Sequence, residues 1–186
     1  MSRLLPLLLV LLLAALPAGA EEFLSGKLLV ASPHMPANPF AETVILVCSH
    51  DGQGAFGLVV NRSAGQAEAD SHSGAGASPA FPLRLGGPVE TKLLFLLMTA
   101  EAAPSGALMV PGGFAVGNPS AFLAGERPAP RRASLMVGYA GWTAGQLEAE
   151  LARGDWMVQD ADEETVFGTR DDAKWRRAVT RRETRL

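Results

Sequence analysis

The residues best suited to covalent chemistry are Cys48 and His50, two positions apart in the stretch CSHDGQGAFGLVVNR. A thiol beside an imidazole base can act as the nucleophile of a hydrolase or as a redox centre. On a strand the two side chains would share a face, with Cα atoms about 6.6 Å apart. Because a nucleophile and its base need contact at about 2.6 to 3.2 Å, only a bulge or a turned ring would join them. We therefore favour a buried Cys48 with His50 at the strand end.

Three glycines in the same stretch, Gly52, Gly54 and Gly57, have the G-x-G-x-x-G spacing of a dinucleotide-binding loop. In that site the glycines lie directly before a helix, and the free backbone amides at the start of the helix bind the phosphates. Here the glycines are followed by the segment LVVN, which has the composition of a strand. We therefore expect a turn, in which Asp51 bonds its own backbone and glycine supplies positive φ. Gly57, inside the strand, predicts the close approach of another backbone.

Metal ligation and nucleic-acid binding lack a basis in the sequence. His34, His50 and His72 are isolated, without a C-x-x-C or H-x-x-x-H pair, so we expect no metal and no cofactor. The formal net charge of −3 gives no general attraction for nucleic acid. The basic run KWRRAVTRRETRL is interpreted as a solvated helix face. One cysteine cannot form an internal disulfide, so a packed core must stabilise the fold.

Residues 1–20 predict an export signal. Arg3 precedes an apolar run from Leu4 to Leu16, and an A-x-A exit follows at residues 18–20. The run is shorter than the roughly 20 residues of a membrane-spanning helix, so we expect cleavage and no stable membrane anchor. Residues 21–186 would then form a periplasmic or secreted protein.

Short strands dominate the expected secondary structure. Lys27–Ser32 and Thr43–His50 predict strands, separated by a Pro-rich loop in which Asn38, before Pro39, predicts a helix start. FGLVVN should form a hairpin with Thr43–His50. FPLRLGGPV and LLFLLMT predict a second strand pair, ALMVPGGFAVG a second hairpin, and ASLMVGYAGW a buried central strand.

Helices are expected near the C-terminus. Thr143 and Gln146 fit a capping box, Leu147 and Leu151 share one face, and Gly154 fits a C-cap. Thr169–Arg182 predicts a last helix that buries Trp175 and Val179. The length of 186 residues fits one domain over residues 21–186. Residues 64–80 are small and polar and predict a flexible loop.

Several motifs resemble the AlgH/YqgE family, in the same order and over nearly all of residues 21–186. They are GKLLVASPHMPANPF, GAFGLVVNR, LGGPV, GYAGWTAGQLEAEL with a following tryptophan, and a late Lys174-Trp175. The resemblance implies a single α/β (α+β) domain, in which a mixed, barrel-like sheet with hairpins is flanked by a few helices. The family carries the label of a transcriptional regulator by association, and no catalytic residue set comes with it.

The chain also departs from the family pattern. Asn38 stands where the family has Asp, Ser63 where it has Pro, and Met98 where Leu-His is expected. An active site that used those Asp and His residues would be lost here. The resemblance implies a cytoplasmic protein, whereas residues 1–20 predict export, so we expect a cytoplasmic role linked to DNA to transfer poorly.

We therefore predict an exported, non-enzymatic binding or regulatory protein, with a protein or small molecule as its partner. The alternative is a thiol-dependent hydrolase or redox protein that uses Cys48 and His50. Gly-rich loops let backbone amides approach a partner, and aromatic residues offer contact area. The predicted binding residues are Asp51, Gly52, Gly54, Asn61, Arg62, Gly86, Gly87, Tyr139 and Trp142.

Overall fold

The computed structural model describes residues 23–65 and 81–183. The expected signal segment, residues 1–20, lies outside the described residues, as does most of the expected loop at 64–80. The strands are β1 Lys27–Ala31, β2 Val44–Asp51, β3 Gly54–Val59, β4 Leu83–Leu85, β5 Val89–Thr99, β6 Leu108–Val110, β7 Phe114–Gly117, β8 Ala133–Thr143 and β9 Trp156–Asp160. The helices are η2 Ala100–Ala102, α2 Ser120–Leu123, α3 Gln146–Ala152, η3 Glu164–Gly168 and α4 Asp171–Glu183.

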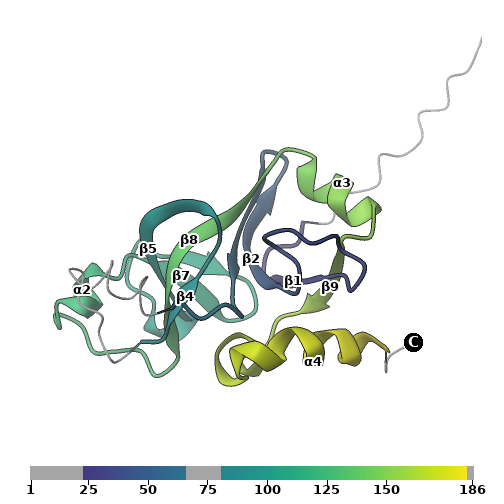
Figure 1. Cartoon of the computed structure of the whole chain (residues 1–186). Helices are drawn as coiled ribbons and strands as arrows, with labels where there is room; N and C mark the ends of the chain where they lie inside the picture. Colours follow the sequence, from purple (N-terminus) through teal and green to yellow (C-terminus); the bar gives the residue numbers. More distant parts are fainter. Residues whose placement is uncertain (1–22, 66–80, 184–186) are drawn as a thin grey trace, which may run out of the picture.

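The strands form one curled sheet in the order β6-β7-β5-β8-β3-β2-β1-β9, and β4 pairs with β8 beside this path. All pairings are antiparallel except β4 with β8, which is parallel. Figure 1 shows the sheet bending at β8, with α3 and α4 beside the half that contains β1, β2 and β9. This architecture confirms the expected mixed, barrel-like sheet with hairpins and a few helices.

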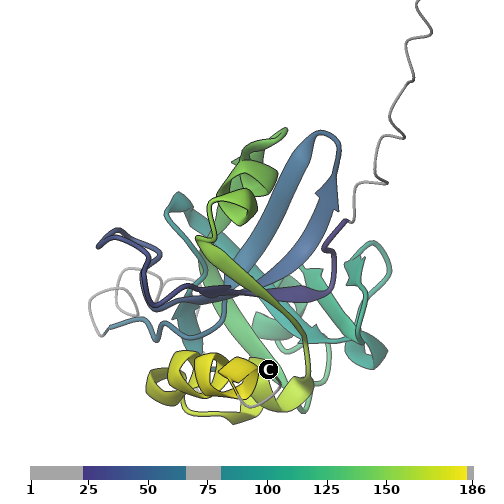
Figure 2. The ribbon, with the colours of Figure 1, turned by 90° about the vertical axis from the view of Figure 1, so that its right-hand side faces the viewer.

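The sheet lies between two core clusters, one packed against each face. Successive side chains of β1 enter the two clusters alternately, because side chains of a strand point to opposite faces. Leu28 and Val30 face the cluster that α4 covers through Ala178. Leu29 and Ala31 face the other cluster, which α3 covers through Leu147. Figure 2 shows α3 and α4 on opposite sides of the crossing strands. The helices expected at these positions are confirmed to within two residues.

The β2–β3 hairpin is confirmed, and its turn is tighter than expected. Asp51 pairs with Gly54, so only Gly52 and Gln53 form the loop. Asp51 Oδ1 accepts the Gln53 N–H at 2.8 Å, as a turn aspartate does. Gly54 is the residue of this turn with positive φ, 135°, and a Cβ there would lie 2.1 Å from the Trp142 carbonyl oxygen.

Strand β8 is confirmed as a central strand, but the predicted pairing of FPLRLGGPV with LLFLLMT is wrong. Residue Val137 of β8 pairs with Leu85 of β4 on one side and with Leu94 of β5 on the other. The connecting chain therefore crosses over β8. It crosses at Gly138, where an added Cβ would lie 2.6 Å from the Gly87 carbonyl oxygen. Backbone packed on backbone at this point leaves no room for a hairpin turn.

The segment before β2 is a turn, so the helix expected at Asn38 is wrong. Asn38 Oδ1 accepts the Phe40 N–H at 2.6 Å, and the Asn38 carbonyl accepts the Ala41 N–H at 3.1 Å. Glu42 then takes a positive φ of 58°, which ends any helical run. Strand β9, at the edge of the sheet beyond β1, is an element that the sequence reading missed.

Candidate functional site

Cys48 lies deep in the core on the α4 side of the sheet. The residue is 1% exposed and packs in the same cluster as Leu58 and Phe114. Its thiol is directed at the Leu46 carbonyl oxygen, 3.5 Å away. Burial raises the pKa of the Cys48 thiol far above its ordinary value, which disfavours the reactive thiolate.

His50 faces the opposite side of the sheet, so the prediction that it shares a face with Cys48 is wrong. Val47 pairs with Gly57 and Ser49 pairs with Phe56, which leaves Cys48 as the extra residue of a β-bulge. The bulge shifts the alternation by one position and turns His50 away. A bulge was expected to be one of two ways of joining the two side chains, and here it separates them.

The partners of His50 are backbone and carboxylate groups. His50 Nδ1 accepts the Leu24 N–H at 3.1 Å, so the ring hydrogen belongs on Nε2, which donates to Glu148 Oε1 at 2.7 Å. The ring also meets Phe23 edge-on, at 5.3 Å between centroids. His50 thus links the segment at Leu24 to helix α3 through two hydrogen bonds. Its ring makes no contact with the Cys48 thiol, which lies on the other face of the sheet.

A groove of about 540 Å³ opens between the β2–β3 hairpin and the second half of β8. Asp51, Gly54, Tyr139 and Trp142 line it, so the fold brings four of the predicted binding residues together. They come from positions nearly ninety residues apart, and the pairing of β3 with β8 joins them. The volume is within the range of about 300 to 1,000 Å³ that is typical of ligand sites.

Aromatic rings form the apolar part of this groove. The Tyr139 and Phe56 rings line the groove in a tilted arrangement with centroids 5.2 Å apart, and the Phe95 ring, outside the lining, meets Tyr139 edge-on at 6.3 Å between centroids. Val89 pairs with Tyr139 and is 36% exposed, which is high for a valine in a sheet. The charged group among the lining side chains is the Asp51 carboxylate at the exposed hairpin tip.

One edge of β8 is open beside these rings. The pairing of β5 with β8 is irregular between Val89 and Leu94 and reaches no further than Tyr139. Beyond it, Gly141, Trp142 and Thr143 pair with β3 on one side and, within residues 23–65 and 81–183, with no strand on the other. The groove therefore contains a short stretch of strand backbone that pairs with no described strand on one side, and within it the Thr143 N–H is engaged by Gln146 Oε1 at 3.1 Å.

The other predicted binding residues lie elsewhere. Gly52 is at the exposed hairpin tip, and Gly86 and Gly87 pack backbone to backbone against β8. Asn61 accepts the Val44 N–H at 2.8 Å and donates to the Glu42 carbonyl at 2.9 Å. Arg62 donates to the Ala41 carbonyl at 3.2 Å, so Asn61 and Arg62 hold the turn before β2.

Glu150 of α3 is a prominent residue that sequence reasoning missed. Its Oε2 atom accepts the indole N–H groups of Trp142 and Trp156, each at 2.8 Å, and its Oε1 atom accepts the Gln146 amide at 3.0 Å. The available signal was the family motif itself, GYAGWTAGQLEAEL followed by tryptophan, in which Glu150 lies between the two tryptophans. Spacing along the chain could not show that both indoles would converge on one carboxylate.

A buried ionic network was also missed. Asp171 accepts hydrogen bonds from Ser63 at 2.7 Å and from Arg84 Nε at 3.1 Å, and Lys174 Nζ lies 3.1 Å away. Arg84 also bonds Ser134. Burial alone would raise the pKa of Asp171, but these hydrogen bonds and positive charges lower it.

Lys174 is fully buried and donates to the carbonyls of Val60 and Val166 at 2.7 and 2.8 Å. Loss of hydration and the nearby Arg84 charge lower the pKa of Lys174 to about 8, while Asp171 opposes the shift. The network joins α4 to the ends of β3 and β4 and to β8.

Within the described residues, no three His, Cys, Asp or Glu side chains are arranged to hold a metal ion. Among the same residues, no helix has the length and apolar character needed to cross a membrane.

Known proteins are similar to this chain in sequence and in fold. A family model described as AlgH-like matches residues 28–186. A UPF0301 protein of Ruegeria pomeroyi is 42% identical over 167 residues, covering 84% of this chain and 90% of that protein. A UPF0301 protein of Gluconobacter oxydans is 40% identical over 167 residues, covering 84% and 89%.

Two solved structures are similar throughout. The solution structure of the AlgH protein from Pseudomonas aeruginosa has a TM-score of 0.70 and 32% identity, covering 89% of this chain and 92% of that one. A crystal structure of a Corynebacterium diphtheriae protein has a TM-score of 0.69 and 24% identity, covering 87% of each chain, and this likeness concerns the fold alone.

Proposed function

The chain belongs to the AlgH-like family, and we propose that it is an exported, non-enzymatic binding protein whose partner is another protein. In this proposal, the groove between the β2–β3 hairpin and β8 receives an extended segment of that partner. Export is proposed from residues 1–20 alone, whose composition is that of a cleavable signal.

The open edge of β8 at Gly141–Thr143 is the observation that carries the proposal. An extended peptide can add to an exposed strand edge through main-chain hydrogen bonds, while pockets beside the edge select its side chains. Here the edge lies beside Val89 and Tyr139, which offer an apolar surface for one or two side chains. Asp51 at the groove mouth favours a donor or a positive charge on the bound segment.

The hydrolase or redox alternative has no such support. Cys48 is buried in the core with a raised pKa, and His50 is engaged by Leu24 and Glu148 on the other face. A nucleophile must reach its base and its substrate, and this thiol reaches neither.

Site-specific photo-crosslinking tests the groove directly. The crosslinker p-benzoylphenylalanine replaces Val89 in one variant and Val158, on β9, in a matched control. The two valines have similar exposure, 36% and 40%, and lie on different strands. Irradiation in envelope extract should join the position-89 variant to a partner, and fragment masses should place the bond in one short segment. Equal capture at both positions, or capture at Val158 alone, would contradict the proposal.

A further inference from the structure

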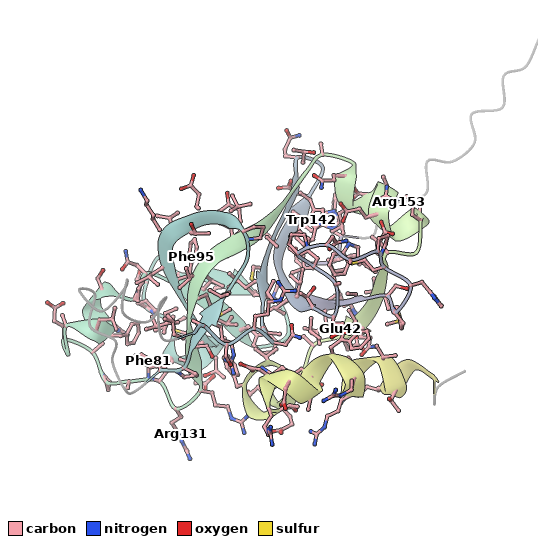
Figure 3. All side chains as sticks on the ribbon, viewed as in Figure 1. Glu42, Phe81, Phe95, Arg131, Trp142 and Arg153 are labelled. Atoms are coloured by element: carbon pink, nitrogen blue, oxygen red, sulfur yellow. The ribbon has the colours of Figure 1, made fainter. Side chains whose placement is uncertain are left out.

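A second cavity, of about 310 Å³, lies between the turn before β2 and helix α3. Its apolar walls are Met35, Phe40 and Trp156, and its polar walls include Glu150 and Arg153. Figure 3 labels Arg153, which directly follows α3, and Trp142 of β8 at this end of the molecule. None of the residues predicted to bind from the sequence lines this cavity.

The Glu150 carboxylate on the cavity wall is hydrogen-bonded by uncharged donors. Glu150 accepts three N–H donors, two from indoles and one from an amide, and none carries a charge. No cationic nitrogen among the described side chains forms an ion pair with Glu150. Arg153 is engaged by Asp155, with contacts of 2.7 and 3.0 Å to Oδ2. The wall therefore carries one carboxylate that has no cationic partner in the described part of the chain.

The aromatic residues of the wall are fixed in orientation. The Phe40 ring meets Trp156 edge-on with centroids 6.1 Å apart, and it stacks at 6.5 Å on Trp142, which supports the wall without lining the cavity. Hydrogen bonds to Glu150 fix both indoles. Aromatic faces attract cations through their quadrupole, and they do so best where water is partly excluded. A rigid aromatic wall beside an unpaired carboxylate is chemically suited to a small organic cation.

From this arrangement we propose that the cavity binds an alkylammonium group, supplied by a lysine side chain of a protein or by a free amine. The ammonium lies against Glu150, and its methylene chain lies along Met35 and Phe40. A primary ammonium supplies one positive charge and three donors, which match the single unpaired carboxylate. The proposal does not depend on the groove, because Trp156 and Glu150 line this cavity and not the groove.

The test is an NMR titration of the protein with n-butylammonium chloride, and with 1-butanol as a neutral probe of the same size. The indole N–H of Trp156 should shift saturably with butylammonium, and binding of butanol should be about tenfold weaker. Trp175 serves as an internal control because its indole N–H donates to the Ala31 carbonyl and it does not line the cavity. No saturable shift of Trp156, or equal shifts with both probes, would overturn the proposal.

Two substitutions locate the binding. Glu150→Gln should weaken butylammonium binding about tenfold and leave butanol binding unchanged, because it removes charge and keeps shape. Glu126→Gln, on an exposed residue near α2, is the matched control and should change neither. If Glu150→Gln fails to fold, the same two titrations are made with Phe40→Leu. Loss of the aromatic face should weaken binding of butylammonium several-fold more than binding of butanol. Unchanged selectivity in the folded variants would overturn the proposal.

A further arm separates the two sources of the ammonium group. Nα-acetyl-lysine methylamide reproduces a lysine within a polypeptide. Binding at least as tight as that of butylammonium supports a protein ligand, and weaker binding supports a free amine; both outcomes support ammonium recognition. Failure of both compounds to shift Trp156 contradicts it.

Discussion

Side-chain chemistry in this protein is decided by which face of the sheet each residue occupies. Cys48 and His50 are two residues apart, yet the bulge places them on opposite faces with different partners. The sequence indicated correctly that Cys48 is buried and that Asp51 is a turn residue. It could not reveal the bulge, because the extra residue is defined only by the register of β2 against β3.

Cys48 should be chemically inert in the folded protein. Its burial and raised pKa predict that iodoacetamide labelling at pH 8 is about a hundredfold slower in the native state than in denaturant, since reaction requires an opening of the core. Mass spectrometry of timed samples measures both rates. Native labelling as fast as that of the unfolded chain would show an accessible thiolate and return the enzyme interpretation to consideration.

Asp171 should matter far more for stability than its neighbour Asp172. Asp171→Asn leaves Arg84 and Lys174 as buried charges without a carboxylate, which should cost about 3 to 5 kcal/mol. Asp172 pairs at the surface with Arg170, so Asp172→Asn should cost less than about 1 kcal/mol. Urea unfolding of the two variants makes the comparison. Similar midpoints would mean that the network does not stabilise α4 on the sheet.

Strands and helices were predicted best where the signal is local. The β2–β3 and β6–β7 hairpins, α3 and α4 follow from glycines and apolar periodicity. The capping box expected at Thr143 is only half formed, because Gln146 Oε1 accepts the Thr143 N–H but the N-cap residue of α3 is Gly145. The pairing of β4 and β5 was wrong because Gly86-Gly87-Pro88 resembles a turn but carries the chain across β8. That crossing depends on contacts between segments about fifty residues apart, which local patterns do not encode.

Two glycines of the β2–β3 turn should differ sharply in tolerance to alanine. Gly54 has φ of 135°, and an added Cβ would lie 2.1 Å from the Trp142 carbonyl, so Gly54→Ala should cost about 2 to 4 kcal/mol. Gly52 has no atom within 4 Å of an added Cβ, so Gly52→Ala should change stability by less than about 0.5 kcal/mol. Thermal melts compare the variants. Equal loss in both would place the strain in the hairpin tip instead of the β3–β8 contact.

At the scale of the whole molecule, the curled sheet brings distant family motifs together. The turn at residues 38–40 lies about a hundred residues before Trp142 of β8 and Glu150 of α3, yet the Phe40 ring stacks on Trp142 and lines the same cavity as Glu150. The resemblance predicted the family and fold class correctly. The two cavities could not be predicted, because the groove depends on the pairing of β3 with β8, and the second cavity depends on how the turn before β2 packs against α3 and Trp156.

Export is a further prediction for the intact chain. Expression of the full sequence in a Gram-negative host should yield an envelope or medium product whose N-terminus is Glu21, because the signal ends at Ala20. Intact-mass measurement identifies the terminus, and Ala18→Tyr, which removes the small residue before the cut, should accumulate precursor. An uncleaved product in the cytoplasm for the unaltered sequence would contradict the export proposal.

Hydrogen–deuterium exchange tests the central claim most directly, with the partner segment found by crosslinking added as a synthetic peptide. Binding at the open edge of β8 should slow exchange within residues 139–143, while the outer strands β6 and β9 remain unchanged. Protection at β6 or β9 with none at 139–143 would contradict the account.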